Sequence, residues 1–286
     1  MTAPHVTGGA RGAGSCEGTT VPVRPLLLEL CVDDVAGALL AERAGLERVE
    51  LCSALSEGGL TPSIGQVART LELVEHVGVQ VLVRPRPGHF VYDEQEVEVM
   101  EADIAAILAL DHAPGVTVGV VVGALTVDAE IDEAVTRRLV AACGQAPVTF
   151  HRAFDLTSDA IRSLATVADL GASRVLTSGG AATAAEGTAT LARLVAAAGE
   201  RVTILAGGGV RAANAARIVA STGVSELHVS ARAFSDPVGG APARLSLTGR
   251  AVPTGKASRP DPDALDALVE AVAPARGLAS AARARS

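Results

Sequence analysis

The sequence predicts an α/β protein built as a single (β/α)8 TIM barrel with a C-terminal extension. Short runs of apolar and β-branched residues alternate with longer stretches of helical periodicity, which is the pattern of a parallel sheet with crossover helices. Eight such units follow one another without a second block of different composition. The 286 residues also suit one barrel, because such domains commonly run to roughly 250 residues.

Eight segments are predicted as strands, and several are apolar almost throughout, as expected of parallel strands buried on both faces. They are Leu26–Val32, Arg48–Ser53, Gln80–Pro85, Thr117–Leu125, Val148–Phe154, Arg174–Gly179, Val202–Gly207 and Glu226–Arg232. A doubly wound open sheet usually carries a glycine-rich fingerprint after its first strand. The chain has no such fingerprint after Val32, so a closed barrel is favoured.

Helical spacing and capping residues predict a helix after each strand. The first opens at Asp33 and Asp34 and ends at Gly45, and the second opens at Thr61-Pro62-Ser63, since proline is tolerated in a first turn. A third begins at Asp93, and the others are Glu130–Cys143, Ser158–Leu170, Glu186–Ala198, Ala212–Ser221 and Pro262–Val272. We expect the barrel to occupy residues 25–275, with a flexible leader over 1–24 and a flexible tail over 276–286.

Composition and charge argue against several classes of partner. A net charge of −8 and an aromatic content of 2% disfavour nucleic-acid binding, which uses clustered positive charge and stacking rings. The longest uncharged apolar stretch, Gly115–Val127, is shorter than the ~20 residues that cross a bilayer. The N-terminal segment lacks the apolar core of a secretory signal, and the four cysteines are irregularly spaced. We therefore expect a reduced, cytoplasmic protein with no nucleic-acid or membrane partner.

Polar residues gather where the predicted strands end, which is the mouth that carries the chemistry of such barrels. The tripeptide Glu-Leu-Cys occurs at residues 29–31 and again at 50–52. Because side chains alternate along a strand, each copy is predicted to aim a carboxylate and then a thiol inward. The other candidates at the mouth are Arg84, Arg86, His151, Arg152, Asp155, Thr177, Ser178, Gly207, Gly208, Gly209, His228, Ser230 and Arg232.

Structural roles for these residues stay open alternatives at this point. Glu29 and Glu50 would also fit a buried ion-pair network with Arg84 or Arg86. Histidines are often hydrogen-bonded core residues, and free cysteines often pack as small hydrophobic groups. For Cys143, on a predicted helix, packing is the favoured role. The collective pattern still indicates a functional mouth, since charged side chains are rarely buried unless paired.

Several motifs together resemble the signature of the CutC family, the copper homeostasis proteins. They are Glu-Leu-Cys at 29–31, Glu-Leu-Cys-Ser-Ala-Leu-Ser-Glu-Gly-Gly-Leu-Thr-Pro-Ser at 50–63, Arg-Pro-Arg at 84–86, Thr-Phe-His-Arg-Ala-Phe-Asp at 149–155, Arg-Val-Leu-Thr-Ser-Gly at 174–179 and Glu-Leu-His-Val-Ser-Ala-Arg at 226–232. The match runs from about Leu27 to Arg232, in order and at similar spacing. One departure is that Pro87 and His89 replace a Gly and the Asp of the family's Arg-Pro-Arg-Gly-Gly-Asp-Phe, which removes a carboxylate from the rim.

The resemblance implies a cytoplasmic barrel that self-associates, with a homodimer favoured, and a role in copper homeostasis. It also makes Cys31 and Cys52 the candidate ligands of Cu(I). The chemistry of the residues agrees with this expectation, because Cu(I) is a soft ion that prefers thiolate ligands. Nearby arginine or protonated histidine favours the thiolate, whereas the nearby carboxylates oppose it.

An enzyme acting on a small phosphorylated or carboxylated metabolite is the alternative function. In that scheme Arg84 and Arg86 clamp the anionic group, and the glycines at 207–209 offer backbone donors. Glu50 or His151 acts as the general base and His228 as the acid. Further catalytic or substrate-binding candidates are Glu29, Asp155, Arg152, Thr177, Ser178, Ser230 and Arg232. Isomerisation, aldol cleavage and lyase chemistry are compatible with this set.

Overall fold

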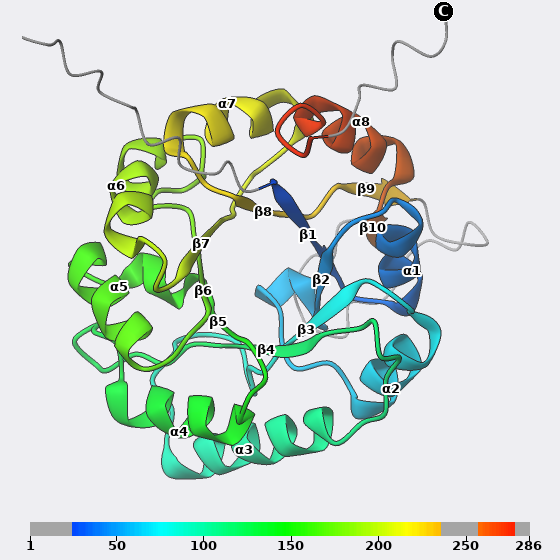
Figure 1. Cartoon of the computed structure of the whole chain (residues 1–286). Helices are drawn as coiled ribbons and strands as arrows, with labels where there is room; N and C mark the ends of the chain where they lie inside the picture. Colours follow the sequence, from blue (N-terminus) through cyan, green and yellow to red (C-terminus); the bar gives the residue numbers. More distant parts are fainter. Residues whose placement is uncertain (1–24, 236–256, 278–286) are drawn as a thin grey trace, which may run out of the picture.

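Eight parallel strands close into a barrel in the computed structural model, which describes residues 25–235 and 257–277. Each strand pairs with the next along the chain, and β8 pairs with β1 (Figure 1). The strands are β1 (Leu27–Val32), β2 (Arg48–Leu51), β3 (Gly78–Leu82), β4 (Val118–Val122), β5 (Val148–Phe150), β6 (Arg174–Thr177), β7 (Thr203–Ala206) and β8 (Glu226–Val229). The predicted (β/α)8 barrel is confirmed.

Helices form the outer ring around the strands, as Figure 1 shows. They are α1 (Val35–Arg43), α2 (Ile64–Leu73), α3 (Glu94–Leu108), α4 (Glu133–Cys143), α5 (Ala160–Asp169), α6 (Thr188–Ala198), α7 (Ala212–Thr222) and α8 (Pro262–Val272). Most begin at a side chain that accepts a hydrogen bond from the first turn, which satisfies an otherwise unpaired backbone donor. These caps are Asp34, Ser63, Asp93, Asp132, Asp159 and Asp261.

Several strands end earlier than the sequence predicted, because the chain leaves the barrel wall at the mouth. After β5, residues Arg152–Leu156 form the 3-10 helix η2, where His151 Nδ1 accepts from the Ala153 N–H. A second 3-10 helix, η1 (Leu55–Glu57), follows β2. After β8, Ala231 adopts a φ of 40°, and β9 (Arg232–Ser235) pairs antiparallel with β10 (Ala257–Pro260) outside the barrel. The residues that the sequence placed at strand ends therefore lie in mouth loops.

The C-terminal extension completes the ring. Helix α8 buries Leu265, Leu268 and Val272 and packs against α7 (Figure 1). Beyond it, the Leu26 N–H donates to the Ala275 carbonyl at 3.1 Å, so the chain at both ends of the barrel meets at one place. The predicted leader over 1–24 lies outside the described residues, as does the predicted tail except for Arg276 and Gly277.

Side chains alternate between two buried regions along each strand. In β1, Leu28, Leu30 and Val32 are fully buried toward the helices, while Glu29 and Cys31 face the barrel interior. The inward-facing side chains of β1 therefore include polar groups, whereas the helix-facing side chains are apolar.

Across residues 25–235 and 257–277, no helix combines the length and the apolar run needed to cross a bilayer.

Two helical glycines allow a matched test of this packing. A Cβ on Gly37, in α1, would lie 2.8 Å from Val32 Cγ1 and 3.1 Å from Pro260 Cγ, whereas a Cβ on Gly65, in α2, would meet nothing within 4 Å. We expect Gly65→Ala to stabilise the fold by about 0.5 to 1 kcal/mol, because alanine lowers the entropy of the unfolded chain. Gly37→Ala should destabilise it. Urea unfolding measures both, and a shift of the same sign for the two variants would contradict this packing.

Candidate functional site

A buried carboxylate, Glu29, organises the barrel interior. Its side chain is 1% exposed and accepts from Arg48 Nε at 2.5 Å. Arg48 also pairs with Glu226 at 2.5 Å, and Arg174 reaches Glu226 at 3.2 Å. The four side chains come from β1, β2, β6 and β8, and they join these strands through alternating charges. Such a chain of pairs offsets the cost of burying each ion.

His228 lies two residues after Glu226 in β8, nearer the mouth, and connects Glu29 to Glu50. Its Nδ1 is 2.7 Å from Glu29 Oε1, and its Nε2 is 3.8 Å from Glu50 Oε2. The strand register explains this placement, because Glu29 is the Cα partner of His228 and Cys31 is the partner of Glu50. A Cβ on the neighbouring Gly207 would lie 2.5 Å from Leu176 Cδ1 and 3.1 Å from His228 Cβ, so only glycine leaves room for both side chains.

The two inward cysteines lie beside this histidine. Cys31 and Cys52 form a buried cluster with Leu82 and Val121, which places both cysteines in one part of the barrel interior. The Cys31 Sγ donates to Glu50 Oε2 at 3.4 Å, and the Cys52 Sγ donates to the Val32 carbonyl at 3.4 Å. Cys31, Glu50 and His228 each offer one ligand atom, and these three atoms lie within 4.8 Å of one another. We call these three residues the mouth cluster.

Burial and charge set distinct protonation states in this region. Burial alone raises the pKa of Glu29, but the His228 hydrogen bond and the Arg48 charge bring it down to about 2. Burial raises the pKa of Glu50, assisted by the Glu29 charge. Burial lowers the pKa of His228, yet Glu50, Cys31 and Glu29 together raise it well above its usual value. The Cys52 thiol, burial and Glu50 raise the pKa of Cys31, so its thiol keeps its proton at neutral pH.

His151 lies apart from the mouth cluster, at the end of β5. Its Nδ1 accepts from the Ala153 N–H at 3.2 Å, and its Nε2 has no hydrogen-bond partner among the described residues. The ring packs against Phe90, with 4.9 Å between centroids. Burial, assisted by the Arg84 charge, lowers the pKa of His151 to about 3. The ring is therefore neutral at ordinary pH, with its proton on Nε2.

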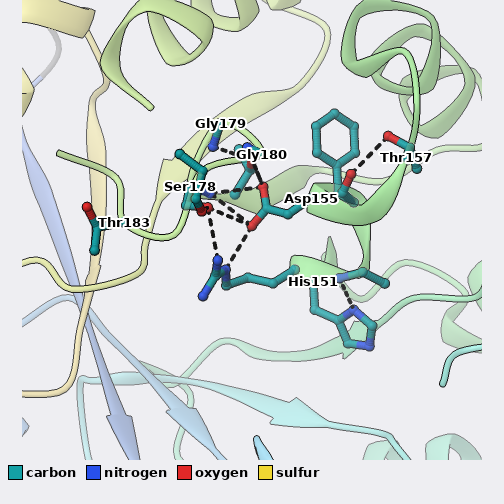
Figure 2. Close-up of polar contacts among 12 residues, drawn as sticks. His151, Asp155, Thr157, Ser178, Gly179, Gly180 and Thr183 are labelled. Atoms are coloured by element: carbon teal, nitrogen blue, oxygen red, sulfur yellow. Dashed lines mark hydrogen bonds and ion pairs between the residues drawn. The ribbon is translucent and has the colours of Figure 1, made fainter. Parts of the chain in front are cut away.

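Asp155 holds the loop after β6, as Figure 2 shows. Its Oδ1 accepts from Thr177 Oγ1 at 2.5 Å and from the Gly180 N–H at 3.0 Å. Its Oδ2 accepts from Arg152 Nε at 2.8 Å and from Ser178 Oγ at 3.0 Å. Both carboxylate oxygens are thus engaged with the protein, so the geometry gives Asp155 a positioning role at this loop.

The arginines predicted to clamp an anion are not brought together. Arg84 donates to the backbone carbonyls of Glu57, Gly59 and Gly88 at 2.9 to 3.0 Å and stacks over Phe90. Arg86 pairs with Glu96 and donates to the carbonyls of His89 and Val91 at 2.8 Å each. Both guanidinium groups therefore hold the loops around β3, including the loop that carries Pro87 and His89.

The remaining predicted residues lie in loops around the mouth. Arg232 Nη2 pairs with Asp33 Oδ1 at 2.9 Å, and Ser230 is exposed directly after β8. The Gly207 N–H donates to the Thr177 carbonyl, and Gly208 and Gly209 have φ values of 99° and 69°, which favour glycine. A Cβ on Gly208 would lie 3.3 Å from Arg152 Nη1. These loops line the mouth without contributing to the mouth cluster.

Sequence reasoning missed three residues of the buried network: Arg48, Arg174 and Glu226. The predicted partners of Glu29 lay near the carboxyl ends of the strands, whereas Arg48, Arg174 and Glu226 are the first residues of β2, β6 and β8. The alternation rule contained the signal, since Arg48 shares a strand face with Glu50 and Glu226 shares one with His228. Glu29 does lie in a buried ion-pair network, but its partner is Arg48, and the predicted partners Arg84 and Arg86 were wrong, because they donate to loop carbonyls and to Glu96.

The fold and the inward residues define a class of protein: a (β/α)8 barrel with thiol, carboxylate and imidazole groups gathered at one mouth. The CutC family model matches residues 26–233. The chain is 45% identical over 212 residues to the copper homeostasis protein cutC homolog of Homo sapiens, covering 73% of this chain and 75% of that protein. It is 46% identical over 205 residues to a CutC family protein of Xanthomonas campestris pv. campestris (strain B100), covering 72% and 83%.

A solved CutC structure from Streptococcus agalactiae superposes with a TM-score of 0.66 at 34% identity, covering 71% of this chain and 97% of that one. The chain therefore belongs to the CutC family, the copper homeostasis proteins. The family predicted from the sequence motifs is confirmed.

The neutral buried state of His151 predicts a pH dependence of stability. A pKa lowered from 6.5 to about 3 means that the unfolded state binds a proton that the folded state refuses. The free energy of unfolding should therefore fall as the pH falls below 6.5, by up to about 1.4 kcal/mol per pH unit from this residue. His151→Gln should show a shallower fall than the parent in urea unfolding between pH 7 and pH 4. Exposed His76 is the matched control, and an equal change in His76→Gln would contradict the assignment.

Proposed function

We propose that this protein binds Cu(I) at Cys31 and Cys52 as its part in copper homeostasis. The observation that carries the proposal is the packing of these two cysteines in one buried cluster at the barrel mouth. Cu(I) is soft and favours sulfur ligands, and Cys31 in β1 and Cys52 directly after β2 supply two sulfurs from neighbouring strands. The human relative is named as a copper homeostasis protein, which agrees with this choice of metal.

The surroundings of the thiols support binding of a monovalent cation. The Cys31 and Cys52 thiols both donate a proton in the metal-free protein, so Cu(I) takes the place of two protons and leaves one negative charge beside His228, whose pKa is raised. Glu29 accepts from His228 Nδ1, which leaves Nε2 as the ring atom nearer Glu50 and Cys31. In metal sites, a carboxylate that accepts from one ring nitrogen of a histidine orients the other ring nitrogen toward the metal. His228 thus offers a third donor beside the two sulfurs.

Burial of the ligands favours retention of copper over rapid exchange. Cys52 is fully buried and Cys31 is 6% exposed, and both lie at the ends of barrel strands held by backbone ladders. A ligand exchange partner would need access to these sulfurs from the mouth. We therefore propose a protein that holds copper rather than one that passes it quickly between partners.

The enzyme alternative has less support from the geometry. A substrate clamp needs Arg84 and Arg86 at the mouth cluster, and both donate instead to loop carbonyls or to Glu96. Asp155 is likewise engaged with the loop after β6. Catalysis on a small anionic metabolite stays a prediction, as do the cytoplasmic location and the homodimer.

Substitution of single cysteines tests the copper site. We expect Cys31→Ser and Cys52→Ser each to weaken Cu(I) binding by about tenfold or more, because serine replaces a soft donor with a hard one. Cys143→Ser is the matched control, since this thiol is also buried but lies on α4, in the outer layer. Competition against a chromophoric Cu(I) chelator under anaerobic conditions measures the affinities. Equal affinities for the parent, Cys31→Ser and Cys52→Ser would rule out the site.

The pH dependence of Cu(I) affinity provides an independent test. Cys31, whose pKa is raised, must release its proton when the metal binds. Affinity should therefore rise with pH, by about tenfold per pH unit for each proton displaced. Cys31 and Cys52 each donate a proton in the metal-free protein, so a slope of up to two protons is expected from the thiols and of up to three if His228 also ligates the metal. His228→Gln should then reduce the slope by one. A pH-independent affinity between pH 6 and pH 8 would contradict thiolate ligation by Cys31.

A further inference from the structure

The mouth cluster contains a donor set that differs from the proposed copper pair. Cys31 offers a sulfur, Glu50 an oxygen and His228 a nitrogen, and the three ligand atoms lie within 4.8 Å of one another. Cys31 Sγ lies 3.4 Å from Glu50 Oε2, and His228 Nε2 lies 3.8 Å from the same oxygen. A soft, a hard and an intermediate donor therefore converge on one point.

These separations match those of a tetrahedral metal site. Zn²⁺ binds sulfur at about 2.3 Å and nitrogen or oxygen at about 2.0 Å, so its ligands in a tetrahedron lie about 3.3 to 3.6 Å apart. The sulfur–oxygen separation of 3.4 Å already falls in this range, and the nitrogen–oxygen separation of 3.8 Å is a few tenths of an ångström longer. Small side-chain rotations would bring the three donors to bonding distance of a single ion.

The charges also match a divalent ion. Once the metal has displaced the protons of Cys31 and His228, thiolate and carboxylate together supply two negative charges and imidazole is a neutral donor, so the set balances one dication. Glu29 is not a ligand in this arrangement, because one of its oxygens accepts from Arg48 and the other from His228. It instead holds the ring with Nε2 toward the cluster, as carboxylates behind zinc-bound histidines do.

The structure assigns Cys31, Glu50 and His228 to a single Zn²⁺ ion, with the fourth coordination position left for water or a small ligand. Three protein ligands with one open position are characteristic of catalytic zinc sites, whereas structural sites use four protein ligands. Cys52 stays outside this set, and its Sγ donates to the Val32 carbonyl. The assignment goes beyond the proposed copper binding: both sites use Cys31, so the two metals exclude each other, but neither site requires the other to exist.

Two substitutions separate the zinc site from the copper site. Glu50→Gln removes the hard charged donor, so it should weaken Zn²⁺ binding by about tenfold or more without weakening Cu(I) binding, since Glu50 opposes the Cys31 thiolate. Cys52→Ser should weaken Cu(I) binding and leave Zn²⁺ affinity nearly unchanged. Both metals are titrated into the full chain against metal-specific chromophoric chelators. Cys16→Ser is the control for metal bound by the leader, and Cys143→Ser is the control for the other buried thiol.

Co²⁺ provides a readout that does not depend on any one variant folding. Bound in place of Zn²⁺, it should give the visible bands of tetrahedral cobalt and a sulfur-to-cobalt charge-transfer band in the unmodified protein. Zn²⁺ should displace it at a ratio of one ion per chain. Cys31→Ser should lose the charge-transfer band, whereas Cys52→Ser should keep it.

The outcomes are distinguishable. Octahedral cobalt bands in the parent protein, or Zn²⁺ affinities unchanged in both Glu50→Gln and Cys31→Ser, would overturn the zinc assignment. Loss of Zn²⁺ binding in Cys52→Ser to the same extent as in Cys31→Ser would also overturn it, because sulfur pairing would then explain both metals. Failure of the copper proposal alone would appear as a Cu(I) affinity insensitive to Cys52→Ser while the cobalt spectrum stays intact.

Discussion

The buried carboxylate of Glu29 is the constraint on which the barrel interior depends. An ionised carboxylate at 1% exposure is unfavourable unless its charge and its lone pairs are met by donors. Arg48 meets one oxygen and His228 the other, and each of these cations is in turn balanced by Glu226 or Glu50. The positions of the strands are thereby linked to one another through charge, and the ring of His228 is held in a single orientation beside Cys31.

The thiol of Cys31 has both a soft and a hard donor group as neighbours. Cys31 has the sulfur of Cys52 as one neighbour and the carboxylate of Glu50 as another. A metal that prefers sulfur and a metal that accepts oxygen would therefore compete for the same ligand, and the choice between them would follow metal availability as well as affinity. The pKa values differ sharply within the group, from about 2 for Glu29 to a raised pKa for Cys31, because His228 and Arg48 outweigh burial only for Glu29.

The alternation of side chains and the strand–helix order predicted the fold and the inward direction of Glu29, Cys31 and Glu50 correctly. Helix starts followed from capping residues such as Asp34 and Asp93, because a cap is a local interaction. Partnerships across the barrel did not follow, since register and loop conformation decide them. Arg86, after β3, pairs with Glu96, a residue ten positions later, and Glu29 meets Arg48 from the next strand where Arg84 or Arg86 was predicted. No pattern within a single strand contains such information.

The two ends of the barrel meet at one place in the closed ring. The N–H of Leu26 donates to the carbonyl of Ala275, and Arg276 reaches Glu47 at 2.5 Å, so the first strand and the last helix are tied at one seam. A short bridge between these two ends, with new ends opened in another loop of the ring, would retain every strand pairing, and the bridge would lie at the end of the barrel opposite the mouth cluster.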